Sequence, residues 1–192
     1  EPKPALTVDL EDYYHGNYPG YKYQSHDFHD SRLEEPTERI LQILSDNGSR
    51  ATFFVLGEII EENRDLILRI SDEGHEIAAH GANHQLIGKQ KPADVISGLR
   101  DNVDRLEDIT GEKVLGYRAP NFSAHPDTTE WLFEGLLEIG LVYDSSRFPS
   151  RNYYGGETGM PRYPHYMLQS GDMELIEVPV SSLGFSPFPF PR

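Results

Sequence analysis

Two histidines, His80 and His84, lie four residues apart in the stretch GHEIAAHGANH, residues 74–84. On a helical turn, side chains at this spacing share one face, so both imidazoles would reach one cation. The apolar residues 77–79 before them predict a short buried strand. Ligand sites of parallel α/β proteins gather at the carboxyl ends of the strands. We interpret the pair as metal ligands, and the alternative is a loop or capping pair.

Acidic residues stand where the first apolar run ends. Residues 5–10 predict a strand, and alternation along it places Asp9 and Glu11 on one face, with Asp12 following directly. Two imidazoles and one carboxylate form a catalytic type of metal site that leaves positions open for water and substrate. The alternative for this acidic run is an ordinary strand end or a helix N-cap.

Arg118 closes a third candidate segment, a strand pattern at residues 114–118 that is followed by Ala119, Pro120 and Asn121. Pro120 stiffens the turn, so the loop amides after it are candidates to face a ligand. A cation beside a second carboxylate keeps that carboxylate ionised, and an ionised carboxylate can act as a general base. A structural ion pair is the alternative for Arg118.

Composition limits the class of protein. The chain has 192 residues, of which 37% are apolar, enough for one compact domain that we expect to span residues 1–192. The formal net charge of −15 repels phosphate backbones and anionic lipid surfaces, so we expect no nucleic-acid partner. Because the sequence contains no cysteine, a metal must be held by histidine and carboxylate.

The sequence shows neither a membrane span nor a signal peptide. No apolar stretch approaches the roughly 20 residues that cross a bilayer, and no basic segment leads into an apolar one at the start. These patterns favour a cytoplasmic location. The proline-rich residues 187–192 are also compatible with a chain truncated at its C-terminus. The oligomeric state is left open.

Strand and helix patterns alternate along the chain. Strands are predicted at residues 5–10, 50–56, 76–79, 114–118, 141–144 and 174–180, and helices at 35–46, 59–71, 92–109 and 128–139. This order predicts an α/β fold with a parallel sheet wrapped by helices. The irregular residues 13–32 and 146–170 predict long loops, which often carry the site. Their tyrosines either pack the loops or stack on sugars.

In four ordered blocks the chain resembles the polysaccharide deacetylases of carbohydrate esterase family 4, the NodB-homology group. The blocks are ATFFVLG at residues 51–57, residues 74–84, GYRAPNFS at 116–123 and YDSS at 143–146. The resemblance covers about residues 5–180. It implies a distorted or incomplete (β/α) barrel and metal-assisted removal of N-acetyl groups from a polysaccharide.

The resemblance also implies residue roles. Asp9 becomes the general base, and Arg118 orients it. His80 and His84 become the metal ligands, and the backbone amide of Asn121 becomes an oxyanion donor. Zinc is the first expectation for the metal, and Co, Ni, Mn or Fe suit the same ligands.

One departure concerns the third metal ligand. The family usually carries two adjacent aspartates at the first strand, whereas here Leu10 separates Asp9 from Glu11 and Asp12. The chain is closer to the subgroup with an Asp-x-Glu-Asp opening. Strand parity favours Glu11 as the third ligand, while the family's preference for a short aspartate arm favours Asp12. We prefer Glu11.

A second departure concerns the general acid. The family's acid is a histidine in an apolar-then-His block on a late strand, and no such block occurs in residues 1–192. His165, in the sequence YPHY, is a poor substitute. Either the acid lies beyond this sequence, or another group serves.

Three rival functions remain at this point. An allantoinase-like relative would open a small cyclic amide on the same fold. A metal-dependent phosphoesterase is disfavoured, because Arg118 is the one prominent cation near the site. A non-catalytic carbohydrate-binding domain is compatible with the absent acid. The expected partner is a carbohydrate, and the sequence does not define which polymer.

Overall fold

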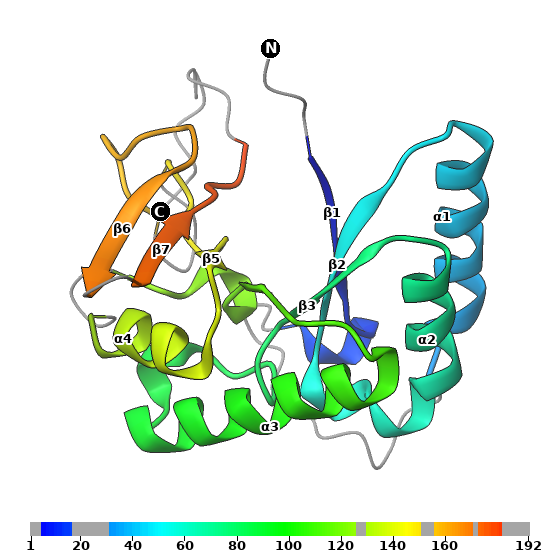
Figure 1. Ribbon diagram of the computed structural model, residues 1–192, viewed down its shortest axis with the longest axis horizontal. Helices are drawn as coiled ribbons and strands as arrows, with labels where there is room; N and C mark the ends of the chain where they lie inside the picture. Colours follow the sequence, from blue (N-terminus) through cyan, green and yellow to red (C-terminus); the bar gives the residue numbers. More distant parts are fainter. Residues whose placement is uncertain (1–4, 17–30, 126–129, 151–155, 171–172, 182–192) are drawn as a thin grey trace.

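Seven strands form one sheet in the computed structural model, which describes residues 5–16, 31–125, 130–150, 156–170 and 173–181. The strand order is β1-β2-β3-β4-β5-β7-β6 (Figure 1). The strands are β1 (Leu6–Leu10), β2 (Ala51–Val55), β3 (Glu76–Ala79), β4 (Gly116–Tyr117), β5 (Tyr143–Asp144), β6 (His165–Ser170) and β7 (Met173–Glu177).

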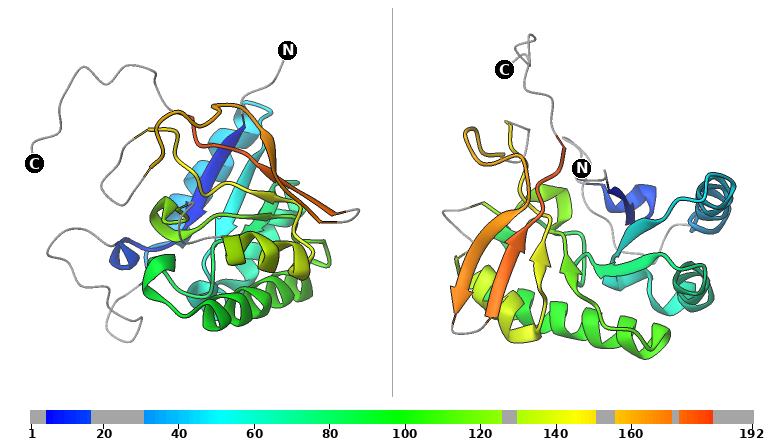
Figure 2. Two further views of the ribbon diagram at one scale, coloured as in Figure 1. Left: turned by 90° about the vertical axis from the view of Figure 1, so that its left-hand side faces the viewer. Right: turned by 45° about the horizontal axis from the view of Figure 1, so that its top comes forward.

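Among the described residues, four α-helices cover one face of this curved sheet (Figures 1 and 2). They are α1 (Glu34–Asp46), α2 (Arg64–Asp72), α3 (Pro92–Thr110) and α4 (Glu130–Ile139). Buried apolar residues recur every three or four positions along α3: Val95, Leu99, Val103 and Leu106. In the part of the chain that the structure describes, no helix is long and apolar enough to cross a membrane.

The parallel α/β prediction is confirmed for six strands. Strands β1 to β5 pair in parallel with their neighbours, and β7 pairs in parallel with β5. Strand β6 pairs antiparallel with β7 and lies within residues 146–170, where the sequence predicted only a loop. The alternation in HYMLQS is weak, and its Tyr166 is exposed, so this edge strand gives little sequence signal.

The helix predicted at residues 59–71 is shorter than expected. Two 3-10 turns, η3 (Gly57–Ile59) and η4 (Glu61–Asn63), come first, and α2 begins only at Arg64. Ile59 and Ile60 are both fully buried although they are consecutive, so they do not follow the one-sided burial of a surface helix. Tertiary packing of these two side chains has replaced the first helical turn.

The sheet curls strongly between β1 and β4. Neighbouring strands lie roughly 4.8 Å apart, so the first and fourth strands of a flat sheet would be separated by about 14 Å. Arg118, directly after β4, spans this interval with its long side chain and donates to Asp9 of β1 at 2.6 Å. The sheet itself is bent as in an incomplete barrel (Figure 2).

Candidate metal centre and catalytic groups

Glu11, His80 and His84 come together at the carboxyl ends of β1 and β3. Their ligand atoms all lie within 4.8 Å of one another. His84 Nε2 lies 2.5 Å from Glu11 Oε2, and His80 Nε2 lies 4.0 Å from the same oxygen. Both imidazoles are buried, while Glu11 is partly exposed. The two histidines and the carboxylate predicted from the sequence thus form one cluster.

The two histidines do not share a helical turn, which corrects the geometry expected from their spacing. The chain from His80 to His84 is irregular, and Gly81 has a left-handed φ of 86°. Backbone bonds fix this segment instead: the amide of His80 donates to the carbonyl of Val55, and the amide of Gly57 donates to the carbonyl of Gly81. The turn at Gly81 brings the imidazoles together in place of a helix.

Hydrogen bonding fixes the tautomer of His80. Its Nδ1 lies 2.8 Å from the carbonyl oxygen of Arg118, which can only accept, so the proton of the neutral ring is on Nδ1. Burial lowers the pKa of His80, which favours the neutral ring. The lone pair is therefore on Nε2, the nitrogen nearer Glu11.

These residues fit a divalent cation. His80 Nε2 is buried and has no hydrogen-bond partner among the described residues. Its lone pair and the oxygen of Glu11 are two acceptors without a shared proton, an arrangement that a cation stabilises. The carbonyl of Arg118 orients the ring through its other nitrogen, as is common for histidine metal ligands.

Asp9 is held by Arg118. The guanidinium donates from Nη1 to Asp9 Oδ1 at 2.6 Å and to Thr7 Oγ1 at 3.0 Å, while Nε and Nη2 bond to the carbonyl and hydroxyl of Ser145. The ring of Phe54 lies under the guanidinium at 4.1 Å. Arg118 is 4% exposed, so its position is fixed on several sides. It therefore holds one oxygen of Asp9 in a defined place.

Asp12, the other candidate for the third ligand, lies outside the cluster and accepts two backbone hydrogen bonds. Its Oδ1 accepts the amide of Tyr13 at 2.9 Å, and its Oδ2 accepts the amide of Arg32 at 2.7 Å. Asp12 is the N-cap of the 3-10 turn η1 (Tyr13–His15). The N-cap interpretation of the acidic run thus applies to Asp12. Glu11, the residue that strand parity favoured, is the carboxylate that lies in the cluster.

Asn121 lies in a strained loop beside the cluster. Asn121 and Phe122 have φ values of 54° and 53°, in the left-handed region that residues other than glycine seldom adopt. A Cβ on Gly81 would lie 3.9 Å from the ring of Pro120, and the hydroxyl of Ser123 accepts the amide of Ile87. The loop after β4 is therefore packed on the segment that carries His80 and His84. The oxyanion role of the Asn121 amide remains a prediction.

Two residues near the cluster were missed by the sequence analysis, namely His15 and Glu58. His15 Nδ1 accepts the amide of Asp12 at 2.9 Å, which leaves the proton on Nε2, 4.0 Å from Glu58 Oε2. Glu58 in turn accepts the backbone amide of His84. Burial lowers the pKa of His15 to about 4, so the ring is neutral near pH 7. The spacing Asp12-x-x-His15 resembles a capping box, the one available sequence signal.

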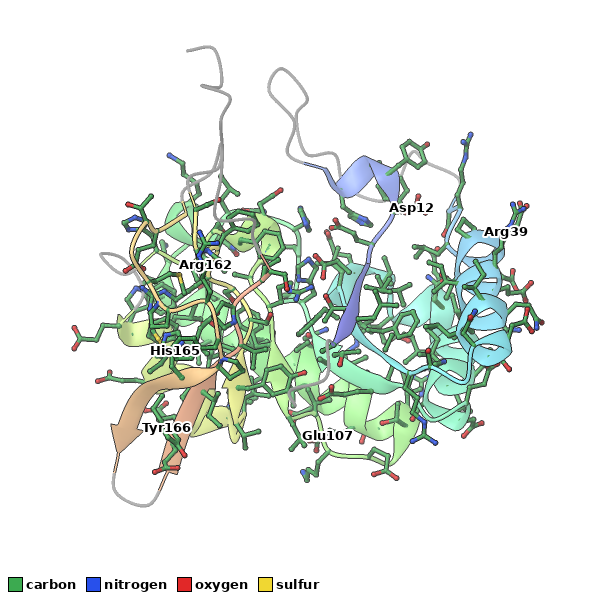
Figure 3. The ribbon with its side chains drawn as sticks, turned by 90° about the horizontal axis from the view of Figure 1, so that it is seen from above. Asp12, Arg39, Glu107, Arg162, His165 and Tyr166 are labelled. Atoms are coloured by element: carbon green, nitrogen blue, oxygen red, sulfur yellow. The ribbon has the colours of Figure 1, made fainter. Side chains whose placement is uncertain are left out.

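His165 lies away from these groups. It stands on the edge strand β6, where its Nδ1 lies 2.9 Å from the carbonyl of Tyr163. Figure 3 shows His165 and Asp12 on separate sides of the view. Among the loop tyrosines, Tyr13 is exposed and Tyr14 is buried, whereas Tyr18, Tyr21 and Tyr23 lie outside the described residues.

The fold and the cluster define a class of protein, a distorted α/β barrel with a candidate metal centre at the carboxyl ends of its strands. A family model described as polysaccharide deacetylase matches residues 22–134, more than half of the chain. The chain therefore belongs to the polysaccharide deacetylase family, as the four sequence blocks predicted.

Individual relatives agree with this assignment. The peptidoglycan deacetylase of Helicobacter pylori is 34% identical over 112 residues, which are 56% of this chain and 36% of that protein. The crystal structure of a putative polysaccharide deacetylase from Mycobacterium smegmatis aligns with a TM-score of 0.62 at 30% identity, covering 76% of this chain and 45% of that one.

The fold is shared more widely than this chemistry. The crystal structure of Puue allantoinase aligns with a TM-score of 0.66 at 18% identity, over 93% of this chain and 61% of that one. Similarity at this identity shows a common fold. The chain spans 26–40% of the length of the first curated relatives that it matches.

Proposed function

We propose that this chain is the catalytic domain of a metal-dependent hydrolase that removes N-acetyl groups from an N-acetylhexosamine polysaccharide. The observation that carries the proposal is the position of Asp9. Its carboxylate is held by the buried Arg118 and is close enough for its charge to act on His80, a member of the Glu11, His80 and His84 cluster. A general base beside a metal centre is the minimal machinery for amide hydrolysis.

Peptidoglycan is the substrate class that the relatives favour. The protein from Helicobacter pylori, 34% identical to this chain in the matched region, is named a peptidoglycan deacetylase. An exopolysaccharide or a chitin-like polymer carries the same acetamide and would use the same groups. The reacting bond is the same in all three polymers, so the site itself does not distinguish among them.

Glu11, His80 and His84 would hold the ion, which when bound supplies Lewis-acid polarisation of the acetamide carbonyl and lowers the pKa of water. Zinc is our first choice. Two nitrogens and one carboxylate oxygen also suit Co, Ni, Mn or Fe, so the donor set selects no single metal.

The protein groups then act as follows. Asp9 accepts the proton of the attacking water at Oδ2, because Arg118 already occupies Oδ1. The guanidinium keeps this carboxylate ionised and oriented before the reaction. The backbone N–H of Asn121 donates to the oxygen that becomes negatively charged when the carbonyl is attacked. Asn121 has a left-handed backbone conformation, in a loop that the bond from the Ile87 amide to Ser123 holds in place.

Two measurements on one set of proteins test the proposal: metal content after purification, and acetate release from N-acetylglucosamine oligomers. We expect about one divalent ion per chain. We also expect both metal and acetate release to be lost in the His80→Ala, His84→Ala double variant. His165→Ala, which changes a histidine on β6, is the matched control and should retain both. Unchanged metal content in the double variant would contradict the metal site.

The same proteins and measurements distinguish the proposed enzyme from a non-catalytic carbohydrate-binding relative. A protein that binds one ion and binds the sugar oligomers, but releases no acetate, is a carbohydrate-binding relative. Ring opening of allantoin without acetate release would instead identify the small-amide hydrolase.

A further inference from the structure

Two buried carboxyl groups face each other behind the catalytic loops. Asp144 and Glu177 are register partners on β5 and β7, both are fully buried, and their side chains are in hydrogen-bond contact. Asp144 Oδ2 and Glu177 Oε2 nevertheless receive no proton from any other described group. Two carboxylates cannot bond to each other unless one of them carries a proton.

The other two carboxyl oxygens have donors. The hydroxyl of Ser146 donates to Asp144 Oδ1, and the amide of Arg147 donates to Glu177 Oε1 at 3.1 Å. The two oxygens that remain without a donor, Asp144 Oδ2 and Glu177 Oε2, therefore lack one proton between them.

Charged neighbours do not neutralise the pair by direct contact. The guanidinium of Arg118 is committed to Asp9 and Ser145, and that of Arg147 pairs with Glu157. Both exert only a longer-range attraction on the carboxyl pair.

Three adjacent elements, β4, β6 and α4, carry the remaining titratable groups near the pair. The phenol of Tyr117 on β4 is buried and its pKa is raised by burial, so it is neutral. His165 on β6 is the register partner of Glu177 and is partly exposed, and its Nδ1 lies 2.9 Å from the carbonyl of Tyr163. The acidic residues of α4 are exposed: Glu130, Glu134 and Glu138.

The pair is linked to the site through two serines. Ser146, which donates to Asp144, accepts the amide of Ala119 at 2.7 Å. Ser145 holds Arg118 and donates to the carbonyl of Val178 at 2.8 Å, directly after Glu177. Ala119 follows Arg118 directly and comes two residues before Asn121. The hydrogen bonds of the two serines therefore connect the carboxyl pair to the segment that carries Arg118 and Asn121.

We propose that Asp144 and Glu177 share one proton and act as positioning residues, holding Ser146 against Ala119 and thereby fixing the loop that carries Arg118 and Asn121. The link to catalysis rests on the proposed function. The shared proton does not, since it follows from the geometry of β5 and β7 alone.

Burial supports this assignment. Loss of hydration, followed by the charge of Asp144, raises the pKa of Glu177 to about 10, and burial raises that of Asp144 to about 6. In the unfolded chain Glu177 loses its proton near its ordinary value of 4.5. Its contribution to stability is therefore fully present below pH 4.5 and is lost as the pH rises toward 10.

Glu177→Gln tests the shared proton. The amide donates permanently to Asp144 and accepts the amide of Arg147, so no proton must be taken up on folding. In chelator-treated protein, we expect the melting temperature of the wild type to fall relative to Glu177→Gln as the pH rises from 5 to 9. Glu174→Gln, at an exposed glutamate of the same strand, should follow the wild type. Parallel pH profiles for all three proteins would overturn the shared proton.

Asp144→Ala and Asp144→Asn test the positioning role. Alanine removes the acceptor of the Ser146 hydroxyl, and asparagine keeps it while donating to Glu177. We expect Asp144→Ala to lower kcat at least tenfold with divalent-metal binding retained, and Asp144→Asn to restore most of kcat. Equal kcat in both variants would overturn positioning, even if the pH profiles support the proton. Absence of acetate release from the wild type would contradict the proposed function and leave the pH test valid.

Discussion

At the scale of single residues, the candidate site is defined by the hydrogen bonds that its side-chain atoms already make. Arg118 makes four hydrogen bonds, to Asp9, Thr7 and both polar groups of Ser145, so it cannot turn away without losing several of them. The proton on Nδ1 of His80 is committed to the carbonyl of Arg118. One residue thus orients both the candidate base and a candidate ligand.

Asp9→Asn should keep the metal and the fold but remove turnover. The amide cannot accept a proton, and general-base catalysis contributes roughly 10²- to 10⁴-fold to the rate. We expect kcat for acetate release to fall within that range while metal content stays at the wild-type level.

Glu11→Gln and Asp12→Asn are the matched variants at the same strand end. Glu11→Gln should lose metal, because its oxygen lies 2.5 Å from His84. Asp12→Asn should keep metal and lose some stability, because it caps η1. If Asp9→Asn lost metal while these two variants retained it, the division of roles would be wrong.

At the scale of elements, the segment from His80 to His84 depends on two glycines outside it. A Cβ on Gly57 would lie 2.6 Å from the carbonyl oxygen of Ala82, and one on Gly98 would lie 2.8 Å from the Cβ of Ala82. Ala82 is therefore wedged between the turn after β2 and helix α3. The sequence block ATFFVLG ends in glycine because the backbones of Gly57 and Ala82 lie too close together for a side chain at position 57.

Gly57→Ala should weaken metal binding without touching a ligand. The obstacle is backbone, which cannot move aside as a flexible side chain does, so the segment carrying His80 and His84 must shift. Changes beside metal ligands typically cost 10- to 100-fold in affinity, and we expect a loss of that size in metal titrations. Gly88→Ala is the control, since a Cβ there meets nothing within 4 Å. Equal affinities in the two variants would show that the segment adapts.

Elements with strong local patterns could be predicted from the sequence, and those that depend on distant packing could not. Strands β1 to β3 were predicted within one residue of their observed ends because their apolar runs are bounded by clear breaks. The turn at Gly81 was taken for helix, since i,i+4 spacing alone does not distinguish the two. Strand β6 was missed because its exposed edge lacks alternation.

The same distinction applies to the candidate site. Asp9, Glu11, His80, His84 and Arg118 could be selected because each lies near the carboxyl end of a predicted strand, and such residues converge at one edge of a parallel sheet. The contacts of His15 and Glu58 could not, because they depend on how η1 meets η3 in three dimensions. The pairing of Asp144 with Glu177 likewise requires the register of β5 on β7.

At the scale of the whole molecule, the question is which group protonates the departing amine. The sequence lacks the apolar-then-His block from which the family takes its acid. Its nearest sequence substitute, His165, lies on the edge strand β6, bonded to the carbonyl of Tyr163. The metal centre and Asp9 meet at the other end of the sheet order, on β1 and β3. A substrate whose leaving group needs no proton therefore tests the general base without the general acid.

We expect this 192-residue chain to cleave aryl acetates, whose leaving groups need no proton, much faster than N-acetylglucosamine oligomers. General-acid catalysis contributes about 10²- to 10⁴-fold, so the ratio of the two kcat/KM values should reach that range after correction for intrinsic reactivity. His165→Ala should change neither value, because the contact of this ring is with the carbonyl of Tyr163 and not with Asp9. Asp9→Asn should lower both, since both reactions need the base. A selective loss of sugar deacetylation in His165→Ala would show instead that this histidine reaches the substrate and donates the proton.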